Sequence, residues 1–413
     1  MKCKKAALAV AAVVLLNVPV FAGEIDKLAQ ILADKGLISY GEAQKVITET
    51  KEETRRQSAS GTNLSLPSWI QNIKFTADVR LRYQGDWNDS DKTRNRERLR
   101  LRFGFEARPV ENLTAAFGLA TGKTSGGADS EPTSTNYTFQ GFSKAPIFVD
   151  YAYLRYDIDN VGKLNAGKIK SNMATWNLKQ LIWDGDINPD GITLNFNRDL
   201  AKGFSLFANL GWLALNADIS KGANQPDVYI FQPGVVYKNG AISVKAAIGY
   251  QQFNTKNKAL YSVPGNSNYL GSYTGSTDFR LINPAVEVKI KEVAGKYGVS
   301  VFGEYVKNTD DSVYKDNNEG GLYGITFGDE KISRLADWNL TFAGRYLMSF
   351  AIPAYLGYSD AYGGASNARG YEIGFNFGLT KNAALAINYL SYKQINGAQN
   401  PKSLAQFDVS YKF

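Results

Sequence analysis

The chain has 413 residues, with 47 lysines and arginines against 39 aspartates and glutamates, a formal net charge of +8, one cysteine and no histidine. The absence of histidine excludes a Ser-His-Asp triad, proton transfer by imidazole and a zinc site built on imidazole. We therefore expect a protein that is not an enzyme and needs no cofactor. The net charge is mild for this length and does not indicate nucleic acid as a partner.

Residues 1–22 have the pattern of a secretory signal peptide. A basic start precedes an apolar run over residues 6–16, and small residues before Ala22 form a cleavage site. The run is shorter than the ~20 residues that a membrane-spanning helix needs. Cleavage after Ala22 would remove Cys3 and three lysines, so we expect a mature chain without cysteine whose net charge falls from +8 to +5.

Residues 23–57 are expected to form a short helical segment in the periplasm. Apolar residues recur at helical spacing, Gly36 supplies a stop, and Ser39 with Glu42 forms a capping box. A small helical hairpin is one interpretation. A self-associating coil is the other, although its apolar stripe is too short for three or four heptads. Residues 58–69 form a polar linker.

From residue 70 to residue 413 the apolar pattern changes to period two. This predicts an all-β fold, a closed antiparallel transmembrane β-barrel of about sixteen strands. Most segments are near the ~9–11 residues that cross a bilayer when tilted, and bacterial single-chain barrels have an even strand number. The expected strands are 70–84, 94–107, 112–121, 147–158, 163–171, 190–198, 203–216, 227–238, 240–253, 279–291, 296–308, 320–330, 335–347, 368–380, 383–394 and 402–413.

The connections between these strands alternate in length. Tight connections at 108–111, 159–162, 238–240 and 380–382 alternate with long ones at 122–146, 172–189, 217–226, 254–278 and 348–367. Short periplasmic turns and long external loops are typical of outer-membrane barrels, so both termini are expected in the periplasm. A soluble β-sandwich is the alternative, but it does not require strand length, turn asymmetry and an export signal to coincide.

The last strand ends on an aromatic residue. Phe413, Tyr411, Val409 and Phe407 share one face, and polar residues share the other. Such a strand resembles the last strand of bacterial outer-membrane barrels, which the barrel assembly machinery reads. We predict that Phe413 and Tyr411 form the assembly signal, and that outer-membrane lipid and lipopolysaccharide surround the barrel.

Seven arginines alternate with apolar residues along the first two predicted strands. If the apolar residues face lipid, the arginines face the lumen, because arginine facing lipid costs about 2–4 kcal/mol at the midplane. We predict a basic pore wall that favours anions. The alternative is that these arginines pair with internal carboxylates, since Asp78 and Glu106 share their face, or with lipopolysaccharide at the rim. The seven are Arg80, Arg82, Arg94, Arg96, Arg98, Arg100 and Arg102.

Residues 172–189 are the third external loop and are acidic at their end. We predict that Asp184, Asp186 and Asp190 lie inside the barrel opposite the arginines and narrow it. A second interpretation is calcium binding, because Asp186, Asn188 and Asp190 match the first half of a calcium loop. Its twelfth position would be Asn197 rather than a bidentate glutamate, so the ligand set is incomplete. The third interpretation is an acidic turn with neither role.

Several short motifs resemble the putative porin family of Gram-negative bacteria. They are residues 149–154 (VDYAYL), 166–170 (AGKIK), 181–191 (LIWDGDINPDG), 324–328 (GITFG) and 337–338 (DW), together with 35–38 (KGLI) in the helical segment. The resemblance implies an outer-membrane channel, monomeric or trimeric, with an undefined substrate and no catalytic residues. We expect a porin that passes small hydrophilic solutes by diffusion. The alternatives are a channel specific for a phosphate-like anion and a plugged structural or adhesive barrel.

Overall fold

The computed structural model describes residues 29–30, 33–34, 38–59, 73–88, 93–122, 132–215, 225–255, 278–310, 315–398 and 400–413. The chain divides into two units, Met1–Ser68 and Trp69–Phe413. The predicted signal peptide over residues 1–22 and most of the predicted linker over 58–69 lie outside the described residues.

The first unit contains helix α3 (Tyr40–Ala59), whose start is fixed by the capping box that the sequence predicts. The backbone N–H of Ser39 donates to the Glu42 carboxylate at 2.8 Å, and the Glu42 amide donates to Ser39 Oγ at 3.2 Å. These two bonds satisfy amides that the first helical turn leaves without partners. In the part of the chain that the structure describes, no helix is both long and apolar enough to cross a membrane.

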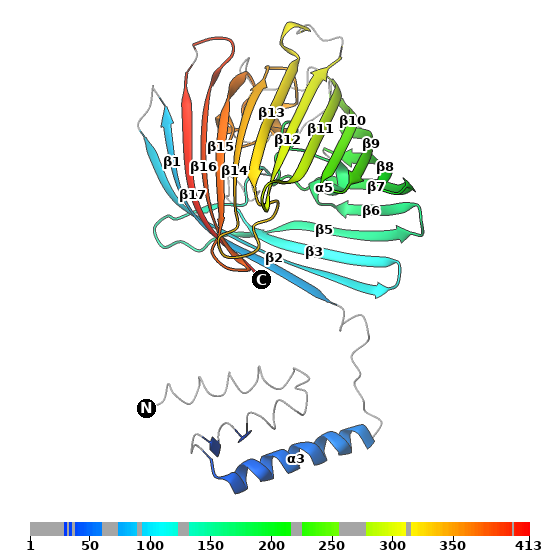
Figure 1. The fold of residues 1–413 in the computed structure, drawn as a ribbon, viewed down its shortest axis with the longest axis vertical. Coiled ribbons are helices and arrows are strands. Elements are labelled where there is room, and N and C mark those ends of the chain that lie inside the picture. The colour runs from blue at the N-terminus through cyan, green and yellow to red at the C-terminus, as the bar shows by residue number, and fades with distance from the viewer. Residues whose placement is uncertain are drawn as a thin grey trace. The chain divides into compact units, whose positions relative to one another are not determined.

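The second unit is built from antiparallel strands joined in one sheet (Figure 1). Of the seventeen strands, β4 has two residues and the other sixteen form the wall. The strands are β1 (Lys74–Asn88), β2 (Arg94–Val110), β3 (Leu113–Thr121), β4 (Tyr137–Thr138), β5 (Ile147–Ile158), β6 (Gly162–Lys168), β7 (Asp190–Ala201), β8 (Phe204–Ala214), β9 (Asp227–Asn239), β10 (Ile242–Asn254), β11 (Phe279–Ala294), β12 (Tyr297–Asn308), β13 (Glu319–Gly328), β14 (Trp338–Leu347), β15 (Ala368–Gly378), β16 (Ala383–Gln394) and β17 (Lys402–Lys412). The short helical elements are α5 (Ser171–Ala174), η2 (Lys315–Asn317), η3 (Ala354–Leu356) and η4 (Tyr362–Gly364).

The sheet closes on itself, because β1 pairs with β2 on one edge and with β17 on the other. Figure 1 shows β17 beside β1. The predicted closed barrel of sixteen strands is therefore confirmed. β5 and β16 have the predicted bounds. β6 ends at Lys168 rather than at residue 171, because the chain turns into the lumen at Ile169, which is fully buried.

The two ends of the barrel differ in the length of their connections. At one end, here called the turn end, the connections include 111–112, 159–161, 202–203, 240–241 and 295–296. Asn160 and Gly240 take φ values of 55° and 53° there, the left-handed conformation that tight turns require and that asparagine and glycine adopt most readily. At the other end, here called the loop end, the connections include 122–146, 169–189 and 348–367.

The outer face of the wall is apolar, but the inner face is not polar throughout. On β9, Tyr229 and Phe231 are 48% and 49% exposed, while Val228 and Ile230, which alternate with them, point inward and are buried. Inward apolar residues continue on β8 and β10–β14, where they form one core with the connections 169–189 and 348–367. The inner face is therefore partly apolar on this side of the barrel, because two long connections bury their own apolar residues against it.

Phe413 contributes to barrel closure through its backbone. Its N–H donates to the carbonyl of Ala77 at 3.0 Å, and its carbonyl accepts from the Ala77 amide at 2.8 Å. Deleting Phe413 removes both bonds, each worth a net ~0.5–1.5 kcal/mol. We expect slower assembly and a folded barrel that is easier to unfold, measured as a lower temperature of the folded-to-unfolded band shift in denaturing gels.

Phe413→Tyr is the matched control, because it keeps the backbone pairing and an aromatic ring beside Tyr411. It should behave like the wild-type chain. Equal yields of folded barrel from the deletion and from Phe413→Tyr would contradict a role for the last residue.

Candidate functional site

The connection 169–189, here called the inner strap, crosses the inside of the barrel. Its residues Ile169, Leu181, Ile182 and Trp183 are almost fully buried against the apolar inner wall. Burying apolar area drives the strap inward, at ~25 cal/mol per Å² removed from water. The strap is the third connection at the loop end, in the place that the sequence predicts for an inward loop.

Wall side chains pair with the polar groups of the strap. Gln232 on β9 accepts from the Trp176 amide at 2.7 Å and donates to the Trp176 carbonyl at 3.0 Å. Gln251 on β10 accepts from the Trp183 indole N–H at 2.9 Å. Both glutamines are at most 1% exposed. A buried backbone or indole group without a partner is costly, so these glutamines let the strap lie in a dry region.

The strap is joined to the connection 348–367 at Asp184. The Asp184 amide donates to the Leu356 carbonyl at 2.8 Å, and the Ser359 amide donates to the Asp184 carboxylate at 2.7 Å. The two connections therefore form one internal layer across the barrel.

Asp186 connects the strap to the arginines of strand β2. Its carboxylate is 2.5 Å from Arg102 Nη2 and accepts from the amide and hydroxyl of Thr135, each at 3.2 Å. The pair joins a strap that packs on β8–β14 to strand β2.

Carboxylates also pair with most of the other arginines of the predicted pore wall, here called the ladder. Two pairs are bidentate: Arg82 donates to Asp408 at 2.7 and 2.8 Å, and Arg100 donates to Asp78 at 3.0 and 3.1 Å. Arg96 makes a single bond to Asp86 at 2.8 Å. Arg82 also lies 3.5 Å from Asp360, and Arg80 lies 3.7 Å from Asp408. The internal carboxylate pairing considered from the sequence is thus present for these residues.

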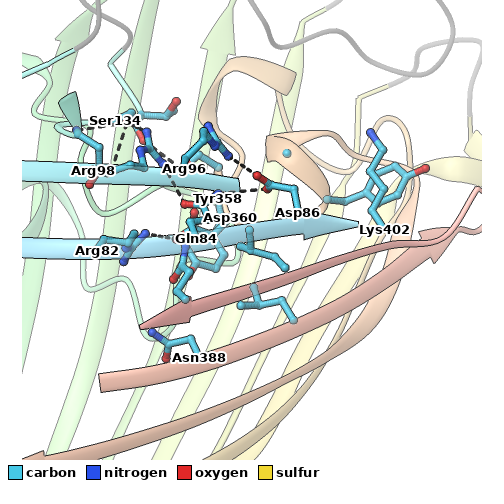
Figure 2. A pocket seen from close by; sticks show the side chains of 18 of the residues that line it. Arg82, Gln84, Asp86, Arg96, Arg98, Ser134, Tyr358, Asp360, Asn388 and Lys402 are labelled. Atoms are coloured by element: carbon cyan, nitrogen blue, oxygen red, sulfur yellow. Dashed lines mark hydrogen bonds and ion pairs between the residues drawn. The ribbon is translucent and has the colours of Figure 1, made fainter. Parts of the chain in front are cut away.

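Arg98 differs from its neighbours in the ladder. It donates to Gln84 Oε1 at 3.0 Å and to Ser134 Oγ at 3.4 Å, and Figure 2 shows it between these polar groups. It is only 8% exposed. No carboxylate among the described residues pairs with Arg98 or with Arg94. Among the described residues, the ladder therefore has more arginines than carboxylate partners.

Two cavities lie on the polar side of the barrel and meet at the strap. The loop-end cavity has a volume of about 780 Å³ and contains most of the ladder. The turn-end cavity has a volume of about 770 Å³ and is lined by Asp78, Arg102 and Asp150 among others. Gly185 and Asp186 line both cavities, so the Asp186–Arg102 pair lies at the border between them, which is the candidate constriction.

The charges of the two cavities differ. The loop-end lining has seven cationic side chains, six of them ladder arginines and one Lys402, against four aspartates. The turn-end lining has three cations, Arg102, Lys170 and Lys412, against three aspartates. Among the described lining residues, the positive excess therefore lies in the loop-end cavity.

The remaining acidic residues of the predicted loop do not act together. Asp190 begins β7, lines neither cavity and lies 3.4 Å from Lys168 Nζ, while Asn188 donates to Asp150. The side chains of Asp186, Asn188 and Asp190 thus bond to different residues, although Lys168 Nζ also donates to the Asn188 carbonyl at 2.9 Å. Within the described ranges no group of three or more acidic, histidine or cysteine side chains is placed to hold a metal ion.

Several site residues were missed from the sequence. Asp408 lies on the polar face of the last strand, and closure pairs it with Arg82 across the β1–β17 edge. Any closed barrel joins its first and last strands, so this contact could have been found. Gln232, Gln251 and Arg345 had no such signal, because their partners lie across the lumen.

The fold and lumen define a transmembrane channel. Residues 87–262 and 254–413 match the Putative porin family, and the chain belongs to this family. The protein is an outer-membrane porin, a channel and not an enzyme.

Solved structures show the same fold at low identity. OprB of Pseudomonas putida is 11% identical with a TM-score of 0.57, over 84% of this chain and 96% of that chain. The outer membrane channel DcaP of Acinetobacter baumannii is 14% identical with a TM-score of 0.50, over 83% of this chain and 97% of that chain. No curated protein sequence matches the chain significantly.

Asp184, in the strap and outside the spanning strands, should make stability depend on pH. Burial raises the pKa of its carboxyl to about 7, with a further contribution from the charge of Asp186. A folded pKa above the unfolded value of about 4 means that folding favours the protonated form. The stability from this group is therefore present below pH ~4 and lost as pH rises through ~7. We expect a higher unfolding temperature at pH 5 than at pH 8.

Asp184→Asn should reduce this difference, because asparagine stays neutral and keeps an acceptor for the Ser359 amide. Asp316→Asn, on an exposed residue, is the control and should keep the wild-type dependence. An unchanged pH dependence in Asp184→Asn would show that other groups cause it.

Proposed function

We propose that the protein is a diffusion pore for small hydrophilic solutes that prefers anions. The observation that carries this proposal is the loop-end cavity, where seven cationic side chains face four carboxylates beside the constriction. A lumen with low-dielectric walls and an excess of one charge concentrates ions of the opposite sign. Solutes would cross the outer membrane through water without covalent chemistry.

The preference is expected to be moderate, because five of the seven ladder arginines have a carboxylate within 4.0 Å. Within the described part of the chain, Arg98, Arg94 and Lys402 are the cavity-lining cations that have no carboxylate within 4.0 Å. Of these, Arg98 is buried in the wall, where its charge is screened least by water.

A channel specific for a phosphate-like anion is the second candidate. Six ladder arginines line the loop-end cavity, and guanidinium groups bind oxyanions through charge-assisted hydrogen bonds. Conductance that saturates with phosphate concentration would favour this candidate, whereas conductance linear in concentration favours a general pore. A plugged structural or adhesive barrel is the third, and the absence of single-channel conductance would favour it.

The proposal includes the orientation of the barrel in the outer membrane. After removal of residues 1–22, the turn end would face the periplasm, where residues 23–57 and both termini would also lie. Lipid and lipopolysaccharide would surround the apolar outer face, and the assembly machinery would recognise Phe413 and Tyr411. A homotrimer is the proposed assembly, tested by the mass of the purified channel in mild detergent.

Arg98→Gln should weaken the anion preference. It removes the buried ladder charge that has no carboxylate partner, while glutamine can still bond to Gln84 and Ser134. If the lost attraction is about 0.4–1 kcal/mol, the chloride-to-potassium permeability ratio falls about two- to fivefold. The measurement is the reversal potential of the channel in a salt gradient.

Arg155→Gln is the matched control. Arg155 is also a buried, inward arginine, but it lies 3.6 Å from Glu106 and 3.2 Å from Asp157. Its replacement should change the ratio less than Arg98→Gln does. If Arg98→Gln leaves the ratio at the wild-type value, Arg98 does not cause the preference. A wild-type chloride-to-potassium ratio of one or less would refute the anion preference itself.

A further inference from the structure

Arg345 on β14 is the wall residue that holds the inner strap at its middle. Its Nη1 donates to the Gln180 carbonyl at 2.7 Å, and its Nη2 donates to the Lys179 carbonyl at 2.9 Å. Its Nε donates to Glu372 on β15 at 3.1 Å. The residue is 5% exposed and lines neither of the two large cavities.

Gln180 connects this anchor to the constriction. Its backbone takes a φ of 60°, a conformation that costs energy for a residue with a side chain and persists where neighbouring contacts hold it. Its side-chain Oε1 accepts from the Gly185 amide at 2.5 Å. Gly185 directly precedes Asp186, whose carboxylate faces Arg102. A continuous chain of contacts therefore runs from β14 through the strap to β2.

We propose that Arg345 is a positioning residue that holds Asp186 against Arg102, and thereby sets the width and the charge of the constriction. This inference rests on the proposed pore function. Arg345 does not line either large cavity, because its guanidinium bonds to two strap carbonyls and to Glu372 and lies over the ring of Tyr358. We therefore expect it to act on the constriction through the strap.

Holding the strap in this way requires the planar guanidinium group of arginine, which offers several donors in a fixed geometry. Two guanidinium nitrogens reach two consecutive carbonyls while the third bonds to Glu372, and the Tyr392 hydroxyl donates to the same Glu372 oxygen. Lysine has the same charge, but its charge and its donors are concentrated on one nitrogen atom, which cannot make these three bonds at once. Arg345→Lys therefore tests the geometry while leaving the local charge balance unchanged.

The expected result for Arg345→Lys is a looser strap. Asp186 would leave Arg102 part of the time, so the passage widens and Arg102 is less often neutralised. Single-channel conductance should rise with added current noise, and the anion-to-cation permeability ratio should rise about twofold or more. Arg369→Lys is the control, because Arg369 is exposed on β15, and it should match the wild type.

A double-mutant cycle separates positioning from a general structural effect. Asp186→Asn alone should raise the anion preference by removing the charge that neutralises Arg102. If Arg345 acts through Asp186, adding Arg345→Lys to Asp186→Asn should change the permeability ratio no further. Additive changes would overturn the inference, because contacting residues in one network are expected to be non-additive.

Gln180→Asn provides a second variant in case Arg345→Lys does not fold. Asparagine tolerates the left-handed backbone but is too short to reach the Gly185 amide. It should shift conductance in the same direction as Arg345→Lys. Wild-type values in Gln180→Asn would overturn the proposed connection.

Amide hydrogen exchange of the strap gives a readout that does not need conductance. Exchange in the peptide containing Gly185 and Asp186 should be about tenfold faster in Arg345→Lys or Gln180→Asn than in the wild type. Unchanged exchange overturns the role of Arg345. A wild-type barrel without measurable conductance would refute the pore function. Faster exchange of the strap in the variants would still support the positioning role of Arg345 in that case.

Discussion

The structure of the lumen depends on one constraint, the pairing of backbone polar groups that the strap carries into a dry region. In a barrel wall the strands satisfy this requirement for one another. The strap has no strand beside it, so side chains of the wall bond to its backbone instead. Gln232 pairs with the amide and carbonyl of Trp176, and Arg345 donates to the carbonyls of Lys179 and Gln180. Without these long polar side chains, the apolar residues of the strap could not be buried at this depth.

The buried strap packs against one side of the barrel and borders two large cavities on the other. On the packed side, a hydrophobic core joins the strap and the connection 348–367 to β8–β14, and the two large cavities lie along the arginine wall. The strap is therefore part of the core as well as part of the pore. Removing it would expose apolar wall residues rather than simply widen the passage, which is why point substitutions report on the constriction more cleanly than deletion.

The sequence was informative where contacts follow from periodicity and failed where they cross the lumen. Alternation located the strands, closure follows from their number and antiparallel order, and the Ser39–Glu42 spacing located the start of α3. The same alternation cannot tell whether an inward residue contacts water or another segment, so it does not predict the burial of Val228 and Ile230.

Contacts made by the strap are also hard to predict from the sequence. Proximity in the chain groups Asp190 with Asp184 and Asp186, yet the turn into β7 places Asp190 next to Lys168. Arg345 lies on a strand with no charge pattern, and its strap partners are more than 160 residues away in the chain.

The arrangement of charges also explains why the ladder can exist. Adjacent arginines in register, such as Arg82 with Arg98 and Arg80 with Arg100, would repel one another if all were unpaired. Aspartates from β1, β17, the strap and the connection 348–367 remove most of that repulsion. Because these carboxylates come from four parts of the chain, the barrel must be closed and both connections in place before the wall is neutralised. The proposed anion preference depends on the positive charge that remains after this pairing, and Arg98, bonded to Gln84 and Ser134 instead of a carboxylate, is the buried part of that charge.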